Sequence, residues 1–167
     1  KGYCRDISFD VKKGEIFGLT GLVGAGRSEV CQGICGLLKP DSGKLYVGGE
    51  ECIFTHPSQA LKKGVGYLPE DRQQQGLILS WELYRNMTLS TLDKYNRLIG
   101  IDTGRERQTG KELCEKLRIK AKSIFSRADS LSGGNQQKVV FAKLLNSDVN
   151  ILLLDEPTKG VDVGAKA

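Results

Sequence analysis

Gly21-Leu22-Val23-Gly24-Ala25-Gly26-Arg27-Ser28 is the stretch that decides the fold of this chain. A short apolar run at residues 16–20 precedes it, and residues 29–38 after it carry apolar side chains at helical spacing. Strand, glycine-rich loop and helix form the context of a phosphate-binding loop of the pattern G-x-x-x-x-G-K-[ST]. Every position fits except the lysine, which is Arg27. The sequence therefore predicts a phosphate-binding loop with an altered cation.

The residue types of this loop suit a bound polyphosphate. Glycines permit tight turns that aim successive backbone N–H groups inward, and the helix N-terminus adds unpaired donors and partial positive charge. The hydroxyl of Ser28 lies where it would ligate Mg²⁺. Arg27 has the right charge, but its planar fork is bulkier than the ammonium group of lysine. The alternative is a glycine-rich turn between a strand and a helix that binds no ligand.

Length, charge and cysteine content narrow the class of protein. The 167 residues fit one domain of ordinary size. The net charge of +5 comes from scattered residues without a block of like charge, which suits an anionic ligand and does not indicate nucleic acid. The five cysteines form no C-x-x-C pair, so we expect no zinc site and a reducing cytosol. The apolar runs are too short to span a bilayer, so any association with a membrane is expected to run through a partner.

The remaining patterns predict an α/β protein. Residues 7–11 alternate apolar and polar side chains and, like residues 16–20, predict a strand. The other predicted elements are a hairpin at 44–54 around Gly48-Gly49, a short helix from Pro57, a strand at 65–69, a polar loop at 70–76, and helices at 77–92 and 105–119. Because the chain starts and ends abruptly in sequence that looks structured, we expect it to be a piece of a longer protein.

Leu131-Ser132-Gly133-Gly134-Asn135-Gln136-Gln137 opens a strongly amphipathic predicted helix. A serine followed by two glycines leaves the first backbone N–H groups of that helix uncovered, so this end suits a phosphate. The alternative is ordinary N-capping by Ser132, which explains the serine but neither the glycines nor the run of amides. The stretch is therefore a second candidate anion site.

The run at residues 151–154 is continuously apolar, which is typical of a strand buried on both faces. It delivers Asp155 and Glu156 at its carboxyl end, where α/β sheets bind ligands. Adjacent carboxylates at a buried strand end need partners. Asp155 could hold Mg²⁺ together with Ser28, and Glu156 could orient and deprotonate an attacking water. The alternative is a carboxylate pair that caps the following turn.

These motifs together resemble the Walker A, signature and Walker B sequences of an ABC ATPase, over nearly the whole chain. The resemblance implies an α/β P-loop NTPase of ABC type with an antiparallel β subdomain and a helical subdomain, truncated at its C-terminus. Within residues 1–167 it implies a nucleotide-binding core with the β subdomain at 1–76 and 127–167. The helical subdomain is expected at about 77–126.

Three stretches are similar to a narrower group: Gly24 to Glu29, Tyr67 to Arg72, and Leu131 to Lys138. They resemble the second nucleotide-binding half of the tandem ATPase in bacterial importers of ribose, galactose, xylose or autoinducer-2. This implies an ATPase that energises solute import at the cytoplasmic face of the cell membrane. The implied partners are the first nucleotide-binding half, membrane permease subunits and, indirectly, a periplasmic or lipid-anchored sugar-binding protein, with no nucleic acid.

The resemblance assigns roles to individual residues, with ATP and Mg²⁺ as cofactors. Glu156 is the implied catalytic residue, and Ser28, Asp155 and Glu70 are the implied metal site. Asp162 corresponds to the D-loop aspartate, and Tyr3 is a candidate adenine platform. The implied ATP-binding residues are Gly21, Leu22, Val23, Gly24, Ala25, Gly26, Arg27, Ser28, Glu29, Leu131, Ser132, Gly133, Gly134, Asn135 and Gln136.

The departures from the general ABC pattern suggest an alternative function. Arg27 replaces lysine and Glu70 replaces the glutamine that contacts Mg²⁺ and the attacking water, which is usual for this half of the family. The chain could then bind nucleotide with little hydrolysis of its own and complete the partner's site through its signature.

The family's switch histidine is expected beyond Ala167, where strands that cover residues 151–154 are also expected. We therefore expect a partly exposed apolar edge and self-association of the chain.

A soluble ABC protein of DNA repair or translation is a third possibility, but zinc modules and strongly basic linkers are absent from the sequence.

Overall fold

The computed structural model describes residues 4–159, which group into two compact units that meet in sequence at Lys63 and Gly64. Each unit is described by itself below. The predicted roles of Tyr3 and Asp162 lie outside the described residues. The predicted core and helical subdomains divide the chain at different positions from these units, and that division stays a prediction.

The first unit contains the predicted hairpin and the short helix from Pro57. Strands β1 (Leu45–Val47) and β2 (Glu50–Cys52) pair antiparallel. Gly48 and Gly49 adopt φ angles of 61° and 83°, the left-handed conformation that a two-residue hairpin turn requires. Helix α2 (Pro57–Lys62) begins at its proline, and Nδ1 of His56 accepts a hydrogen bond from the Ser58 N–H at 3.2 Å.

The predicted strands at 7–11 and 16–20 are wrong, because neither segment is paired as a strand. Phe9 and Phe17 bring the two segments together by stacking, with ring centroids 5.0 Å apart. A strand is defined by backbone pairing with a neighbour, and among the described residues of this unit only β1 and β2 form such a ladder. The apolar patterns of these two segments therefore did not produce strands, and Ile16 is fully exposed.

Helix α1 (Arg27–Ile34) is shorter than the predicted helix at 29–38. Gly36 ends it with a φ of 78°, and a Cβ there would lie 2.8 Å from the carbonyl oxygen of Phe54. The N–H groups of Leu37 and Leu38 both donate to the Gln32 carbonyl, at 2.8 and 3.1 Å. The close approach of the backbone at Gly36 thus stops the helix before the apolar residues that followed the helical spacing.

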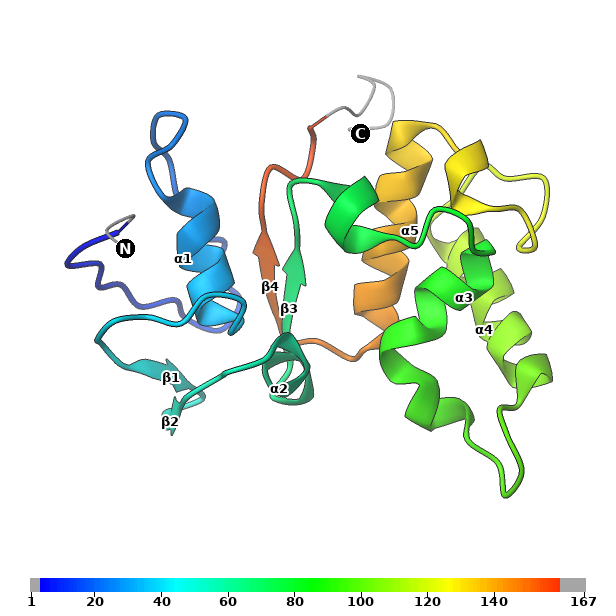
Figure 1. Cartoon of the computed structure of the whole chain (residues 1–167), viewed down its shortest axis with the longest axis horizontal. Coiled ribbons are helices and arrows are strands. Elements are labelled where there is room, and N and C mark those ends of the chain that lie inside the picture. Colours follow the sequence, from blue (N-terminus) through cyan, green and yellow to red (C-terminus); the bar gives the residue numbers. More distant parts are fainter. Residues whose placement is uncertain (1–3, 160–167) are drawn as a thin grey trace. The chain divides into compact units, whose positions relative to one another are not determined.

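The second unit is built on two parallel strands, β3 (Val65–Leu68) and β4 (Ile151–Leu154), which confirm the predicted strands. Helix α5 (Gly133–Asn146) lies beside them (Figure 1). A Cβ at Gly66 would lie 3.1 Å from Leu144 of that helix, so the glycine permits close packing of β3 on α5. The prediction that β4 is buried on both faces is wrong, since Ile151, Leu152 and Leu154 are 41%, 43% and 42% exposed.

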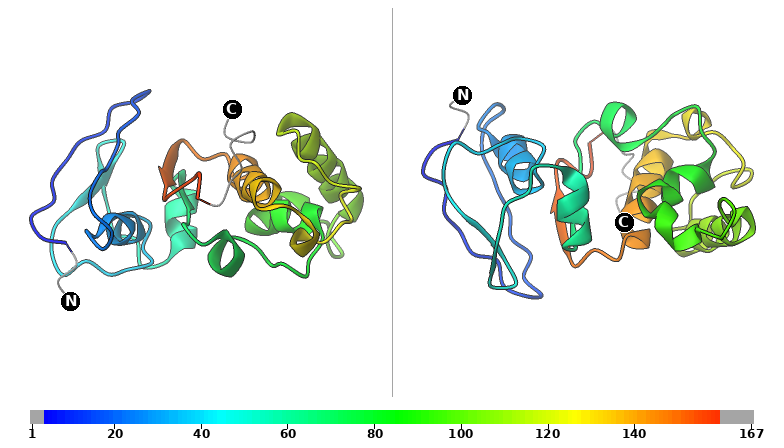
Figure 2. Two further views of the ribbon diagram at one scale, coloured as in Figure 1. Left: turned by 90° about the horizontal axis from the view of Figure 1, so that it is seen from above. Right: turned by 60° about the horizontal axis from the view of Figure 1, so that its bottom comes forward.

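Helices complete the second unit. Helix α3 (Leu83–Thr88) packs on α5 and on α4 (Thr103–Lys116), as Figures 1 and 2 show. The shorter turns are the π-helical η1 (Arg72–Gly76) and the 3-10 segments η2 (Leu89–Tyr95) and η3 (Ala128–Ser130). Side chains of Leu68, Leu83, Met87 and Val139 are fully buried between these elements. Among the described helices none is long and apolar enough to cross a membrane.

The helix predicted at 77–92 begins only at Leu83, and the reason is Asn86. The Asn86 side chain accepts a hydrogen bond from the Ile78 N–H at 2.8 Å and donates to the Ile78 carbonyl at 3.0 Å. These bonds satisfy backbone groups that a helix would otherwise pair internally. The segment before α3 is therefore a turn fixed by one side chain.

Candidate functional site

The glycine loop of the first unit turns into α1 through two left-handed glycines. Gly24 and Gly26 have φ angles of 82° and 90°, and Gly26 is the N-cap of α1. The Gly26 carbonyl accepts the Val30 N–H at 3.0 Å, and Ala25 N–H donates to the Leu22 carbonyl at 3.0 Å. Non-glycine residues rarely adopt such φ angles, so the spacing of the glycines determines the course of the loop.

The residues of this loop fit a phosphate group. A Cβ at Gly24 would meet no atom within 4 Å, so the loop is open at that position. Gly26 provides no side-chain cap to α1, and the first N–H groups of a helix have no acceptor within it. These donors and the helix dipole favour an anion at the turn occupied by Arg27 and Ser28.

The carboxyl ends of β3 and β4 lie at one edge, because the strands are parallel and Leu68 is paired with Leu154. The N–H of Asp155 donates to the Leu68 carbonyl at 3.0 Å and continues this pairing. The hydroxyl of Tyr67 donates to Oδ2 of Asp155 at 3.1 Å. The Asp155 carboxylate is buried and oriented by a strand residue, which is the arrangement expected of a fixed ligand rather than a mobile surface group.

Glu156 follows in a strained conformation. Its φ is 46°, in the left-handed region that few residues other than glycine adopt, and its carbonyl accepts the Lys159 N–H at 2.9 Å. Such backbone costs about 1–3 kcal/mol and is concentrated at functional sites. The turn therefore holds an exposed carboxylate directly after the buried Asp155.

Glu70 follows β3 and forms an ion pair with Lys159. The same lysine is held through its backbone, since Arg72 donates to the Lys159 carbonyl at 2.7 Å. The hydrogen bond with Glu70 raises the pKa of Lys159. A metal-binding role for Glu70 would require this ion pair to open, and that role stays a prediction.

The signature stretch leads into α5, and the capping alternative for its serine is wrong. Ser132 is the N-cap residue, but its side chain makes no hydrogen bond to the first turn. Its hydroxyl oxygen instead accepts from Nδ2 of Asn135 at 3.0 Å, while Oδ1 of Asn135 accepts the Lys120 N–H at 2.8 Å. The helix therefore starts at Gly133 and Gly134 without a side-chain cap, which favours an external anion.

Gln136 in the same turn is buried, and both ends of its amide are used inside the unit. Nε2 donates to the Ala128 carbonyl at 3.1 Å, and Oε1 accepts from Nε2 of Gln73 at 2.9 Å. Direct contact of Gln136 with ATP therefore stays a prediction. The sequence assigned no role to Gln73 or Tyr67, whose partners lie 63 and 88 residues away along the chain, although Tyr67 opens one of the stretches that carry the resemblance.

The sequence of the whole chain was compared with models of known protein families. The family model described as ABC transporter matches residues 4–159. The chain belongs to the ABC transporter family. The stretches that resemble its Walker A, signature and Walker B motifs, at residues 21–28, 131–137 and 151–156, all lie within the matched range, and their roles in binding ATP stay predictions.

Curated relatives of this ABC chain are named as sugar importers. The chain is 50% identical over 167 residues to "Ribose import ATP-binding protein RbsA" of Caldanaerobacter subterraneus subsp. tengcongensis, covering 99% of the chain and 34% of the relative. It is 47% identical over 162 residues to "Putative ribose/galactose/methyl galactoside import ATP-binding protein 1" of Rhizobium meliloti, covering 97% of the chain and 32% of the relative. The chain thus spans about a third of the length of these relatives.

Solved structures show the same fold. The chain resembles the dimeric structure of MJ0796, described as a bacterial ABC transporter cassette, with a TM-score of 0.77 and 24% identity over 95% of the chain and 67% of that protein. A post-hydrolysis state of the same cassette, described as bound to ADP and phosphate, gives a TM-score of 0.75. The predicted ABC ATPase cassette fold is confirmed.

The motifs of this ABC chain divide between its two units. Walker A with Ser28 belongs to the first unit, whereas Glu70, Asp155, Glu156 and the signature belong to the second. Within the second unit the structure brings Tyr67 and Asp155 together at the strand edge. The joint binding of Mg²⁺ by Ser28 and Asp155 stays a prediction. Residues 4–159 contain no cluster of three His, Cys, Asp or Glu side chains that could hold a metal ion by themselves. In proteins Mg²⁺ is usually held by one or two carboxylates and the phosphates of its nucleotide. The oxygen groups of Ser28 and Asp155 are therefore of the chemical type that Mg²⁺ binds.

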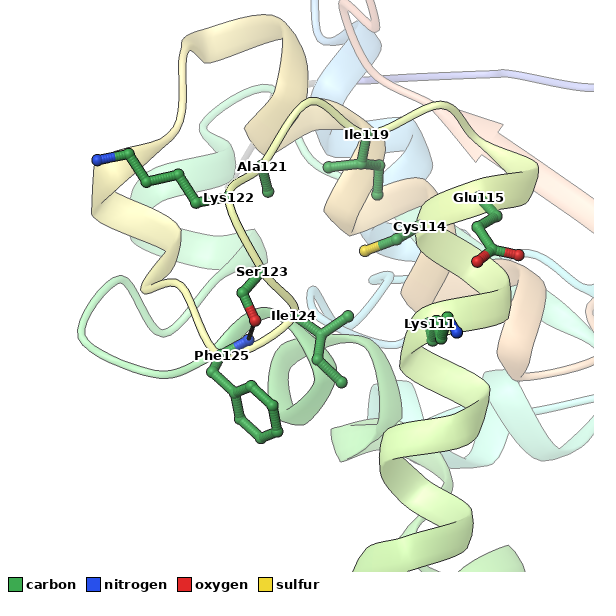
Figure 3. Close-up of a pocket in the computed structure, with 9 residues that line it drawn as sticks. All are labelled: Lys111, Cys114, Glu115, Ile119, Ala121, Lys122, Ser123, Ile124 and Phe125. Atoms are coloured by element: carbon green, nitrogen blue, oxygen red, sulfur yellow. Dashed lines mark hydrogen bonds between the residues drawn. The ribbon is translucent and has the colours of Figure 1, made fainter.

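A cavity of about 460 Å³ lies elsewhere, between α4 and residues 119–125 (Figure 3). Cys114 and Ile119 line it with Phe125, and burial raises the pKa of the Cys114 thiol. The lining residues include none of the predicted site residues.

Proposed function

We propose that this chain binds ATP with Mg²⁺ and forms part of an ATPase that energises import of a monosaccharide or a sugar-like solute. The single observation that carries the proposal is the strand edge, where the buried Asp155 is held by Tyr67 and followed by the strained Glu156. The names of the relatives support sugar as the class of solute.

We further propose that the chain is the second of two nucleotide-binding halves packed head to tail. Arg27 and Glu70 support this assignment, since both depart from the general pattern in the way that this half does. The chain would then contribute its Walker A motif to one ATP site and its signature to the other. Its partners would be the first half and membrane permease subunits at the cytoplasmic face of the membrane, with a sugar-binding protein acting through the permease.

The residues of the chain have distinct roles in the proposed reaction. Glu156 orients the attacking water and accepts its proton, and Asp155 with Ser28 provides oxygen ligands. Bound Mg²⁺ supplies charge neutralisation at the β- and γ-phosphates. Backbone N–H groups of the Walker A loop hold the phosphates, and Tyr67 keeps the Asp155 carboxylate in one orientation.

Glu156→Gln tests hydrolysis at the chain's own site. In the protein as its gene encodes it, purified with its membrane partners, the variant should lower MgATP hydrolysis at the site that contains Glu156 by about 100-fold, because loss of a general base typically costs that much. Glu115→Gln on the exposed surface of α4 is the matched control and should hydrolyse as the wild type. Full hydrolysis by Glu156→Gln would contradict the catalytic role.

Ser132→Arg tests the alternative in which the chain mainly completes its partner's site. If that alternative holds, Ser132→Arg should stop turnover while Glu156→Gln leaves most of it, and Arg27→Lys with Glu70→Gln should raise turnover. Ser90→Arg, at an exposed position of η2, controls for the added charge. If the double substitution leaves turnover unchanged, the alternative loses its support.

A further inference from the structure

One face of α5 holds the turn η1. Gln136, Val140 and Lys143 are spaced four and three residues apart, so they lie along one side of the helix. Nε2 of Gln73 donates to Oε1 of Gln136 at 2.9 Å, and Lys143 donates through Nζ to the Gly76 carbonyl. Val140 lies between these two contacts, 3.0 Å from the position that a Cβ of Gly76 would take. The turn is thus attached to the helix at both ends.

The same turn is tied to the strand edge. Asp71 caps it, because Oδ1 accepts the N–H groups of Gln73 and Gln74 at 3.0 and 3.1 Å. Arg72 donates to the Lys159 carbonyl, and Lys159 pairs with Glu70. The short segment from Glu70 to Gly76 therefore connects the carboxyl edge of the strands to the helix that begins at the signature.

The bonding of Gln136 determines what it needs from position 73. Its Nε2 donates to the Ala128 carbonyl at 3.1 Å, and this bond assigns the amide orientation. Oε1 must then face Gln73, so a hydrogen-bond donor is required there. Gln136 also donates its backbone N–H to the Ser132 carbonyl at 2.9 Å. The side chain of Gln136 thus holds Ala128, just before the signature, while its backbone holds Ser132 within the signature.

We propose that Gln73 is a positioning residue for the signature: its amide donates to Gln136 and thereby fixes Ser132 to Gly134 relative to the strand edge. The inference rests on the proposed function, in which this signature covers ATP bound by the partner half. Without a donor at position 73, Oε1 of the buried Gln136 loses its partner, and the amide turns or takes up water. The first turn of α5 then varies in position, and small misplacements of groups that contact a reacting phosphate reduce its rate of reaction.

The test uses three variants of the protein as its gene encodes it, with its membrane partners. Gln73→Met keeps the length of the side chain but removes the donor, whereas Gln73→Lys keeps a donor. Gln74→Met is the matched control, since its exposed side chain is the next in the same turn. The measurements are kcat and KM for MgATP, and amide hydrogen exchange without nucleotide at Gln136 and Gln137, the first residues of α5 whose N–H groups have an acceptor in the helical turn.

For Gln73→Met we expect exchange at Gln136 and Gln137 about fivefold faster, as for loss of one hydrogen bond. We expect kcat to fall about fivefold and KM to change by less than about twofold, because the signature is misplaced while ATP still binds to the partner's own loop. Gln73→Lys and Gln74→Met should resemble the wild type in all three measurements.

Three outcomes would overturn the inference: unchanged exchange in Gln73→Met, equal loss of kcat in Gln73→Lys, or equal loss in Gln74→Met. A failure of the proposed function is distinguishable, because a wild-type protein that hydrolyses no ATP contradicts that function directly. In that case the positioning of residues 132–134 is decided by hydrogen exchange alone, since it is measured without nucleotide.

Discussion

At the residue scale, Lys143 shows what it costs to bury a charged group. It is partly buried on α5, and burial lowers its pKa from the ordinary value of 10.5. The unfolded chain therefore binds this proton more tightly, and the unfolding free energy rises with pH between the lowered pKa and 10.5. The cost of burial is fully present below that window.

As the pH rises, the unfolding free energy of the wild type should therefore increase relative to that of Lys143→Met. The change amounts to about 1.4 kcal/mol for each unit by which burial lowers the pKa. Denaturant unfolding of both proteins from neutral pH to about pH 10 measures it, because the methionine does not titrate. A difference that stays flat across this range contradicts the effect of burial.

The same scale shows which site residues the sequence could reveal. Asp155 and Glu156 were predicted because a local apolar run places them at a strand end. The contacts of Tyr67 and Gln73 were not predicted, because their partners are brought to them by the parallel pairing of β3 with β4 and by the packing of α5. Contacts that depend on topology leave no spacing signal in a single sequence.

At the element scale, the packing of α3 on α4 depends on Gly110. A Cβ there would lie 2.5 Å from the Cβ and 3.0 Å from the Cα of Tyr84, and neither atom belongs to the flexible end of a side chain. Gly110→Ala should therefore destabilise the protein by about 1–3 kcal/mol through overpacking. Thermal unfolding of the variant and the wild type measures this loss.

Gly104→Ala is the matched control in the same helix. Its new Cβ would have Asp102 Oδ1 at 3.4 Å as its nearest neighbour, an ordinary contact. We expect a gain of about 0.5–1 kcal/mol from the higher helix propensity of alanine. If Gly110→Ala stabilises the protein as Gly104→Ala does, propensity rather than packing determines the effect at Gly110.

Elements with strong local signals were predicted well. The Gly48-Gly49 hairpin, the helix start at Pro57, and the strands before Pro69 and Asp155 all formed, because turn residues or a short apolar run mark each of them in the local sequence. The strands predicted at 7–11 and 16–20 did not form, because a strand requires a ladder partner as well as an alternating pattern or an apolar run. The predicted helix boundaries were wrong at two places. The backbone of Phe54 approaches Gly36 at the end of α1, and the side chain of Asn86 binds Ile78 before the start of α3.

At the scale of the whole molecule, apolar surface remains accessible in both units. In the first, Ile16, Leu22 and Ile53 are at least four-fifths exposed, and in the second each of Ile151, Leu152 and Leu154 of β4 is about two-fifths exposed. Among the described residues β4 pairs only with β3. A strand with apolar side chains and one paired edge is a template for association.

We therefore expect the 167-residue chain, prepared as such, to self-associate through β4. Ile151→Lys should reduce association, because a charge on an edge strand opposes pairing with another copy, and residue 151 is the strand position farthest from Asp155. Leu98→Lys is the matched control, because it adds the same charge at a fully exposed residue that lies outside any strand. Light scattering across a concentration series measures the mass of the particles. A wild-type chain that stays monomeric, or equal effects of the two lysines, would show that β4 is not the surface through which copies associate.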